Sequence, residues 1–433
     1  MNNDELVDQM VQRLGVEIKS LLKDSQASRV PVGALEALVR QGLWHFGAQA
    51  MGILLESRDE ALVGQRKVKD RPTRTMVTLF GPVDVTRSRC VDGSYPLDEA
   101  LGLEGRHGWT AAVQEAVSLL SCESGFGTVS DIMKRLLGLS ISDARVQEVA
   151  EQAGRRAAEV LPSAPAPLEH DASGKTLVLA TDGCQAPQRD GWHEVKVGTV
   201  YTNESRAKTA GGRGKVMVKE YLGSLDAAHA WGEWLRRAAD LWKADKARRI
   251  VFMGDGAPWI WNLAEEHFPQ AIEIVDYFHA VEHLWDTGEA LWGNRDASSA
   301  TQGWVRHNRR LLKKGRVDLV IAAVERGQIA QASQLSQSAT ATVRRNLEYF
   351  RTNRHRMQYD RYRRLKLPIG TGAVEGSCKF VVQSRFKKPG ARWSEPGLRQ
   401  MLALKLARLN NQWEPSGHTY AWQDDPGNRN ARV

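Results

Sequence analysis

The chain has 433 residues, 42% hydrophobic and 26% charged, a composition typical of a globular protein with more than one domain and unlike that of disordered or fibrous proteins. It contains no run of about 18 uncharged apolar residues and no basic start followed by an apolar stretch, so we expect neither a spanning helix nor a secretion signal. Four widely separated cysteines favour a reducing, intracellular compartment: Cys90, Cys122, Cys184 and Cys378.

The net charge of +9 is distributed unevenly along the chain. Residues 301–400 contain 22 Lys and Arg against 6 Asp and Glu, a net charge of +16, which leaves −7 for all other residues. Such asymmetry indicates a surface for a polyanion, most simply nucleic acid. A solvated helix face is the alternative interpretation of the same pattern.

Helical patterns dominate the first 160 residues. Apolar residues at every fourth position predict a helix over residues 4–24, and a second helix is predicted from about residue 32 to 58. Alternation around Gly81-Pro82 predicts a short β-hairpin over residues 75–90.

A pair of helices follows within residues 109–159. They are joined by residues 138–142, with Ser142 as the expected N-cap of the second helix. This arrangement resembles a helix-turn-helix, although most helix pairs of this kind only pack together. Three prolines then mark residues 161–175 as a linker.

The pattern changes to mixed β and α structure after the linker. Strands are predicted at 176–183, 193–202 and 215–225, then a tryptophan-rich helix, a strand at 249–256, a helix at 258–266, a strand at 271–276 and a helix from Tyr277. This order predicts an α/β sheet of mixed strand direction. The predicted regions are an N-terminal helical region (1–70), a β-hairpin segment (71–104), a helix-turn-helix-like region (105–165), an α/β core (172–290), a basic helical segment (291–366), C-terminal helices (367–413) and a polar tail (414–433).

Two aspartates occupy equivalent positions in this pattern. Asp182 and Asp255 each end an apolar strand and each precede a glycine, where rigid backbone presents a carboxylate with room for a ligand. For either one alone, a turn-forming Asp-Gly is the simpler interpretation.

Glu375 is the third candidate acid. It lies in the first turn of a predicted helix, where a favourable interaction with the helix dipole would also explain it. Three carboxylates that converge on one point repel one another unless cations neutralise them, and hard divalent ions accept such oxygen ligands. Two ions about 4 Å apart are used in phosphodiester chemistry.

Three blocks of the sequence resemble bacterial insertion-sequence transposases of the DDE class, most closely the ISKra group. They are DGCQAPQRDGWHEVKVGTVY (182–201), GDGAPWIWNLAEEHFPQAIEIVDYFHAVEHLW (254–285) and GTGAVEGSCKFVVQSRFKKPGARWSEPGLRQMLALK (370–405). The resemblance implies a ribonuclease-H-like core interrupted by an all-helical insertion, which the 119 residues between Asp255 and Glu375 would contain. It also implies that Asp182, Asp255 and Glu375 bind two Mg²⁺ or Mn²⁺ ions and carry the catalysis.

The resemblance assigns further residues around the acids. Asp276 and His279 match an Asp-x-x-His motif that supports the site or contacts flanking DNA, whereas the simpler interpretation of Asp276 is a helix cap. Relatives often carry a zinc-ribbon half where this chain has Cys90 alone, so we predict no zinc. Six basic residues are predicted to contact DNA: Lys196, Lys379, Arg385, Lys387, Lys388 and Arg392.

The predicted function is a DNA transposase that cleaves the ends of its element and transfers the strand into target DNA. The expected partners are double-stranded DNA, both terminal inverted repeats and target, and further copies of the chain in a homodimer or larger assembly. The expected location is the bacterial cytoplasm, at the nucleoid. Alternatives are a structure-selective ribonuclease-H-fold nuclease and a non-catalytic DNA-binding protein derived from a transposase.

Overall fold

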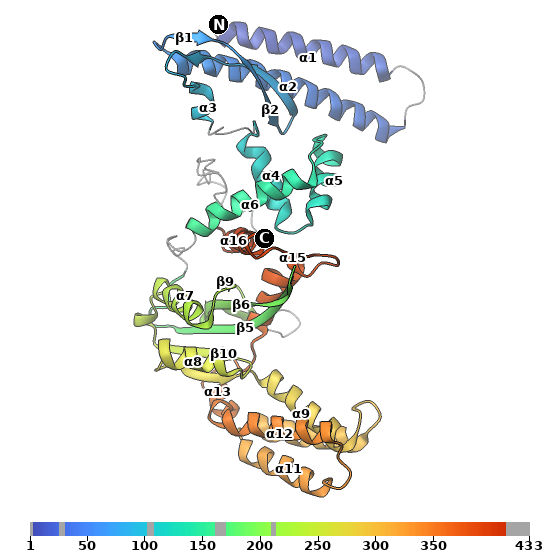
Figure 1. Cartoon of the computed structure of the whole chain (residues 1–433), viewed down its shortest axis with the longest axis vertical. Helices are drawn as coiled ribbons and strands as arrows, with labels where there is room; N and C mark the ends of the chain where they lie inside the picture. The colour runs from blue at the N-terminus through green and yellow to red at the C-terminus, as the bar shows by residue number, and fades with distance from the viewer. Residues whose placement is uncertain (1–2, 26–30, 102–107, 161–169, 209–213, 413–433) are drawn as a thin grey trace. The chain divides into compact units, whose positions relative to one another are not determined.

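A computed structural model describes residues 3–25, 31–101, 108–160, 170–208 and 214–412 (Figure 1). The chain divides into two compact units, one of residues 1–159 with 413–433 and one of residues 160–412. Most of the predicted linker, 161–169, and the predicted tail from 414 lie outside the described residues. Within the described part of the chain, no helix is both long and apolar enough to span a membrane.

The first unit begins with the two predicted helices. Helices α1 (Asn3–Ser25) and α2 (Val32–Val63) confirm them, and α2 continues five residues further than predicted. The predicted hairpin is also present, as β2 (Thr73–Thr78) paired with β3 (Gly81–Thr86), and it is followed by the short helix α3 (Pro96–Ala100). A second small pair joins β1 (Val68–Asp70) to β4 (Arg89–Cys90). Leu55, Met76, Val83, Val85 and Leu97 form the core beneath these elements.

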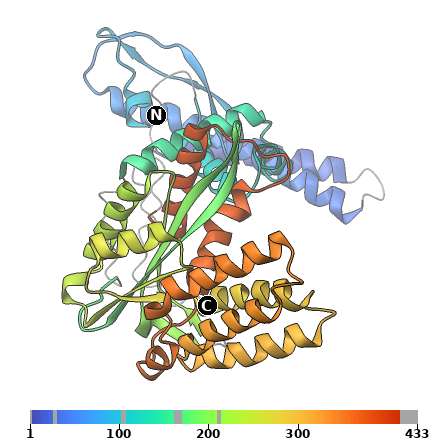
Figure 2. The same cartoon turned by 60° about the horizontal axis from the view of Figure 1, so that its bottom comes forward.

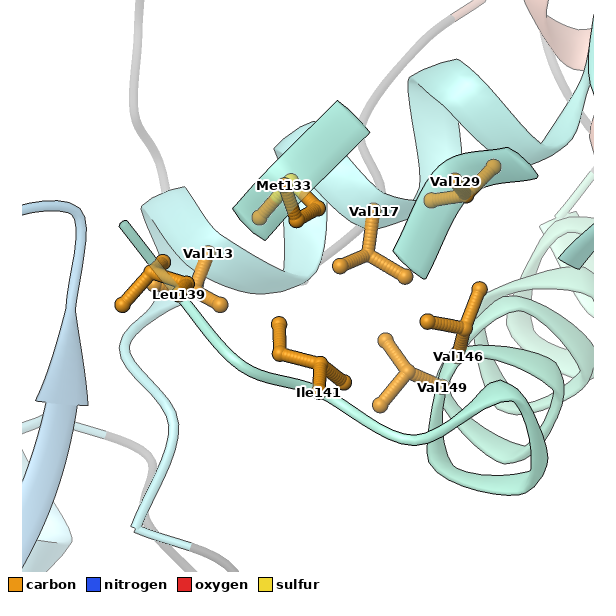
Figure 3. Packing of buried hydrophobic residues seen from close by; sticks show 8 residues of the cluster. All are labelled: Val113, Val117, Val129, Met133, Leu139, Ile141, Val146 and Val149. Atoms are coloured by element: carbon orange, nitrogen blue, oxygen red, sulfur yellow. The ribbon is translucent and has the colours of Figure 1, made fainter. Parts of the chain in front are cut away.

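Three more helices follow: α4 (Ala111–Ser121), and then α5 (Phe126–Leu137) and α6 (Asp143–Val160), which confirm the predicted pair joined at residues 138–142. Their apolar faces meet in one cluster that includes Val117, Val129 and Val146 (Figure 3). Helix α5 ends at Gly138 in the left-handed conformation, and the Ser142 hydroxyl accepts a hydrogen bond from the Arg145 amide at 3.4 Å. The helix pair is therefore built as expected, with Ser142 near the start of α6.

The second unit contains a five-stranded mixed sheet, which confirms the α/β class. Its strands are β5 (Thr176–Gln188), β6 (Gly191–Thr202), β9 (Glu220–Ser224), β10 (Arg249–Gly254) and β11 (Ile272–Val275). The order in the sheet is β11-β10-β5-β6-β9. Strands β5, β6 and β9 are antiparallel neighbours, whereas β10 runs parallel to both β5 and β11.

Two strand predictions need correction. Strand β5 does not end after Gly183 but continues to Gln188, because residues 183–188 pair in register with the first residues of β6. The predicted strand 215–225 is split: β8 (Gly214–Val216) pairs with β7 (Arg206–Lys208) outside the main sheet, and only β9 joins it. Asp182 therefore lies inside a strand and not at its end.

Some helices of this unit lie beside the sheet, and others form the predicted basic segment. Helices α7 (Ala228–Leu241) and α8 (Pro258–His267) accompany the sheet, and α9 (Tyr277–Trp292) leads from β11 into a bundle (Figure 2). The bundle contains α10 (Ser299–Lys313), α11 (Val317–Ala330), α12 (Gln337–Thr352) and the short α13 (Tyr359–Arg364), with Leu291, Val324, Val343 and Leu347 in its core.

The chain then returns to the sheet through one continuous helical segment. It consists of α14 (Gly372–Ser377), a π-helical stretch Cys378–Gln383 and α15 (Ser384–Phe386). Helix α16 (Glu395–Leu409) follows and packs against β9, and most of its side chains are buried. The π-helical stretch is of interest because such bulges are frequent at functional sites.

A buried carboxyl in β9 gives a stability prediction. Glu220 is buried, and burial raises its pKa although Trp242 Nε1 donates a hydrogen bond to its Oε2 at 2.6 Å. The folded chain thus binds this proton at a higher pH than the unfolded chain, so stability falls as pH rises through the raised pKa and stays reduced above it. Glu220→Gln removes the charge and keeps an acceptor for Trp242.

We expect this variant to raise the Tm by about 2–4 °C at pH 8, which corresponds to roughly 1 kcal/mol, and to change it little at pH 4. Thermal unfolding of both proteins at the two pH values is the measurement. A variant that is equally or less stable at pH 8 would show that the buried charge carries no penalty.

Candidate active site

Asp182 lies in the middle of β5, the central strand of the sheet. Its Oδ1 accepts a hydrogen bond from the Gly183 amide at 2.7 Å, and the Cys378 thiol lies 3.7 Å from its Oδ2. Burial raises the pKa of this carboxyl, and the negative charge of Asp255 raises it further. Asp182 and Asp255 therefore lie close enough to repel each other.

Asp255 follows β10 directly and is held in a tight turn. Its Oδ1 accepts from the Ala257 amide at 2.9 Å, and its backbone carbonyl accepts from the Tyr349 hydroxyl at 2.8 Å. The next residue, Gly256, has φ +114°, and a Cβ there would lie 2.4 Å from the Tyr349 ring. Glycine is thus required at this position both by the backbone conformation and by the approach of the ring.

Tyr349 connects the helical bundle to the Asp255 turn. It belongs to α12, and burial together with the charges of Asp255, Asp276 and Glu282 raises its pKa well above the ordinary tyrosine value. The hydroxyl therefore stays protonated and donates to the Asp255 loop. The sequence contains no local signal for this contact, because 94 residues separate the two partners.

Glu375 is exposed in the first turn of α14. Partial burial raises the pKa of its carboxyl, the charges of Asp276 and Asp182 raise it further, and the Lys379 ammonium lowers it. The three predicted acids thus lie within electrostatic reach one after another: the charge of Asp255 acts on Asp182, and that of Asp182 acts on Glu375. Their donor atoms are all carboxylate oxygens.

Asp276 connects the start of α9 to the start of α14, the helix that contains Glu375. It caps α9, since its Oδ1 accepts from the amides of Phe278 at 2.5 Å and His279 at 2.9 Å. Its Oδ2 accepts from both the amide and the hydroxyl of Thr371, the residue just before α14. The side chain is 1% exposed. Both interpretations of Asp276 therefore apply, because the cap of α9 also fixes the start of the helix that carries Glu375.

His279 lies beside the acids and remains partly exposed. Its charge lowers the pKa of Asp182, and its Nδ1 lies 3.4 Å from the Glu282 carboxylate. His283, one turn later, is instead committed to the bundle: its Nδ1 lies 2.9 Å from Asn346 Oδ1, and its ring stacks on Tyr349. Only the first histidine of the pair is thus available to a substrate at this site.

A family model described as "Uncharacterised protein family (UPF0236)" matches residues 29–417, which include every residue of this site. The chain belongs to this family. A curated relative, "UPF0236 protein in vanSb 3'region" of Streptococcus gallolyticus, is 24% identical over 414 residues, 92% of this chain and 86% of the relative. The match therefore extends over both units of this UPF0236 member.

Two of the predicted DNA contacts are buried and have partners within the chain. Lys196 is 8% exposed, with its ammonium 3.3 Å from the Glu194 carboxylate, and Arg385 is 3% exposed, with its guanidinium over the Trp393 ring. Buried cations with partners are structural, so neither is placed to reach a phosphate. Four predicted contacts remain at least partly exposed: Lys379, Lys387, Lys388 and Arg392.

The three acids fit hard divalent cations by their chemistry, because Mg²⁺ and Mn²⁺ prefer oxygen ligands. Among the described residues, one group brings three ligand atoms within 4.8 Å of one another, and it is not the three acids but His229, Glu266 and His267. That group belongs to α7 and α8, with His229 and Glu266 exposed and His229 Nδ1 3.2 Å from the Glu266 carboxylate. We assign no function to it.

The raised pKa values of Asp182 and Glu375 give a prediction for metal binding. A divalent ion requires both carboxyls to be deprotonated, and their pKa values lie above the ordinary range. The affinity for the metal ion should therefore fall as pH decreases through these raised pKa values. The fall should begin at a higher pH than at a site of ordinary carboxylates. We expect Mn²⁺ to bind roughly tenfold more weakly at pH 5 than at pH 7.5, measured by isothermal titration. Equal affinity at both pH values would contradict a site built on these two acids.

Proposed function

We propose that this protein is a metal-dependent DNA transposase of the DDE class. The observation that carries the proposal is the convergence of Asp182, Asp255 and Glu375, which come from three distant segments and act electrostatically on one another. Three acids in which the charge of one raises the pKa of the next, with Lys379 and His279 as basic neighbours, favour bound cations. The resemblance of the surrounding blocks to insertion-sequence transposases supports the same function.

The sheet supports a ribonuclease-H-like core as part of this proposal. Three antiparallel strands are followed by two parallel ones, and Asp182 and Asp255 lie on the neighbouring strand β5 and just after β10. The all-helical bundle lies between the second and third acids, as such an insertion requires. The parallel pairing of β5 with β10 is what brings the first two acids side by side.

In the proposed mechanism, Asp182, Asp255 and Glu375 hold two Mg²⁺ or Mn²⁺ ions. Bound ions of this kind activate a water or 3′-hydroxyl and stabilise the leaving oxygen of a phosphodiester. The chain's own part is to fix the acids: Asp276 holds the start of α14, and Tyr349 holds the Asp255 turn. Lys379, on the same helical segment as Glu375, can bind the phosphate and keep it in place.

The bundle provides a surface that suits the DNA backbone. On α10, Arg306, Arg310 and Lys313 follow one another at helical spacing, all exposed, and within the described residues none of them forms an ion pair. Unpaired cations in a row bind phosphates without reading sequence. In the same proposal, α5 and α6 recognise the terminal inverted repeats, and two copies of the chain bring two ends together.

The test is incubation of the full-length protein with Mg²⁺ or Mn²⁺ and a labelled duplex that contains the element's own end. A transposase cuts at the end and joins the freed 3′-hydroxyl to a second duplex. A structure-selective nuclease cuts branched DNA without joining it, and a binding-only protein retards the duplex without cutting it. Metal-independent cutting, or none with either ion, would contradict the proposed chemistry.

A further inference from the structure

Exposed aromatic rings gather on the segments that form the candidate site. The large apolar side chains exposed on the described surface include four aromatic ones: Phe80, Trp192, Phe278 and Phe380. Three of them, Trp192 at 60%, Phe278 at 57% and Phe380 at 55%, belong to the segments that carry the acids or flank them. Single exposed apolar residues need no explanation, but three exposed rings on the segments that carry or flank the acids indicate a ligand with flat apolar faces.

Phe278 is held rigidly beside the site. Its amide donates to Asp276 Oδ1 at 2.5 Å, and its ring lies against Gly370, where an added Cβ would be 2.7 Å from the ring. Tyr277 supports it edge-on, with ring centroids 5.5 Å apart. The ring is therefore preorganised while more than half of the residue faces solvent.

Phe380 belongs to the helical segment of Glu375. Phe380 lies in the π-helical stretch Cys378–Gln383, which continues directly from α14, the helix that contains Glu375. Glu375, Lys379 and Phe380 are all exposed, whereas Cys378 and Val381 are buried. The exposed side of this segment thus includes an acid, a cation and an aromatic ring within six residues.

Trp192 adds a ring at the start of β6. The Lys387 ammonium lies 5.8 Å from the centroid of this ring, so a cation again accompanies an exposed aromatic side chain. Trp393 is different, because it is 7% exposed and its Nε1 donates to the Phe386 carbonyl at 3.2 Å. Trp192 is therefore exposed to a ligand, whereas Trp393 is not.

We propose that the candidate site takes DNA whose bases next to the reacting phosphate are unpaired, and that Phe278 and Phe380 stack on those bases, with Trp192 as a further platform. The inference rests on the proposed function and adds that the DNA substrate has unpaired bases at the site. Bases in a duplex already bury their faces against their neighbours, so protein rings have little to stack on until bases unpair. Aromatic rings interleaved with cations such as Lys379 and Lys387 are the means by which proteins hold unpaired strands.

The experiment measures binding of the full-length protein by fluorescence anisotropy in EDTA, where no cleavage occurs. The probes are a blunt 30-base-pair duplex and the same duplex with ten unpaired bases at its centre. Their sequence is arbitrary, because stacking tolerates any base. The variants are Phe278→Leu and Phe380→Leu, which keep an apolar side chain but remove the ring, and Phe278→Tyr and Phe380→Tyr, which keep the ring. Ile329→Ala, an exposed apolar residue of α11, is the control.

We expect the wild type to prefer the probe with unpaired bases, and each Leu variant to bind that probe roughly 5- to 100-fold more weakly with little change for the blunt duplex. The Tyr variants should restore binding. Equal affinity of the wild type for both probes, or equal losses on both, overturns the stacking proposal while DNA binding itself stands. Failure of the wild type to bind either probe contradicts the proposed function as well.

Discussion

Asp182→Asn, Asp255→Asn and Glu375→Gln should each lower metal-dependent cleavage by at least about a thousandfold, because in the proposed mechanism each removes a negatively charged ligand from the two ions. DNA binding should change less than about threefold, since phosphate contacts come from the exposed cations and not from the acids. The measurement is cleavage of a labelled end-containing duplex, with binding followed in parallel by anisotropy.

A matched control separates ligand loss from general loss of negative charge. Glu348→Gln removes a carboxylate of α12 that accepts a hydrogen bond from Thr352 and lies outside the acid group. It should cleave like the wild type. If one of the three acid variants also cleaves normally, that residue does not belong to the site.

Asp276→Ala should be the most damaging change among the supporting residues. It removes the cap of α9, worth about 0.5–2 kcal/mol, and leaves the buried Thr371 donors without an acceptor, which costs about 1–3 kcal/mol. We therefore expect a loss of about 2–4 kcal/mol in urea unfolding and at least a hundredfold loss of cleavage, because the start of α14 is released.

Two further variants separate positioning from stability. Asp276→Asn keeps an acceptor for the α9 amides but opposes the Thr371 donors with an amide group, so it should lose more cleavage than stability. Ser298→Ala removes the cap of α10, where the hydroxyl accepts from the Thr301 amide at 3.1 Å, and should cost about 1 kcal/mol while cleavage is retained. A folded Asp276→Ala protein with normal cleavage would show that Asp276 does not position Glu375.

The elements that could be predicted from sequence are those with strong local patterns. The apolar runs before Asp182 and Asp255 are long enough to specify buried strands. Apolar residues at every fourth position of residues 4–24 specify a helix. The end of β5 could not be predicted, because residues 183–188 contain Gly, Pro and polar side chains and extend only through pairing with β6. Pairing between distant residues has no local signal.

The three acids of the candidate site could be singled out from the sequence, but the residues that contact them could not. The strand end before Asp255 and the helix start at Glu375 were predictable, but Asp182 lies inside β5, and the contact of Tyr349 with the Asp255 turn depends on how the bundle packs on the sheet. The burial of Lys196 and Arg385 was missed for a similar reason. A basic residue in a motif looks like a phosphate contact until its neighbours, here Glu194 and the Trp393 ring, are known.

The most direct test of the account is to locate Mn²⁺ by anomalous diffraction in crystals of the full-length protein soaked at pH 7.5. The account predicts two Mn²⁺ peaks bounded by the carboxylates of Asp182, Asp255 and Glu375, and their loss in Asp255→Asn crystals. Peaks only elsewhere, for example at His229 and Glu266, or no peaks at all, would contradict the claim that these three acids form a two-metal site.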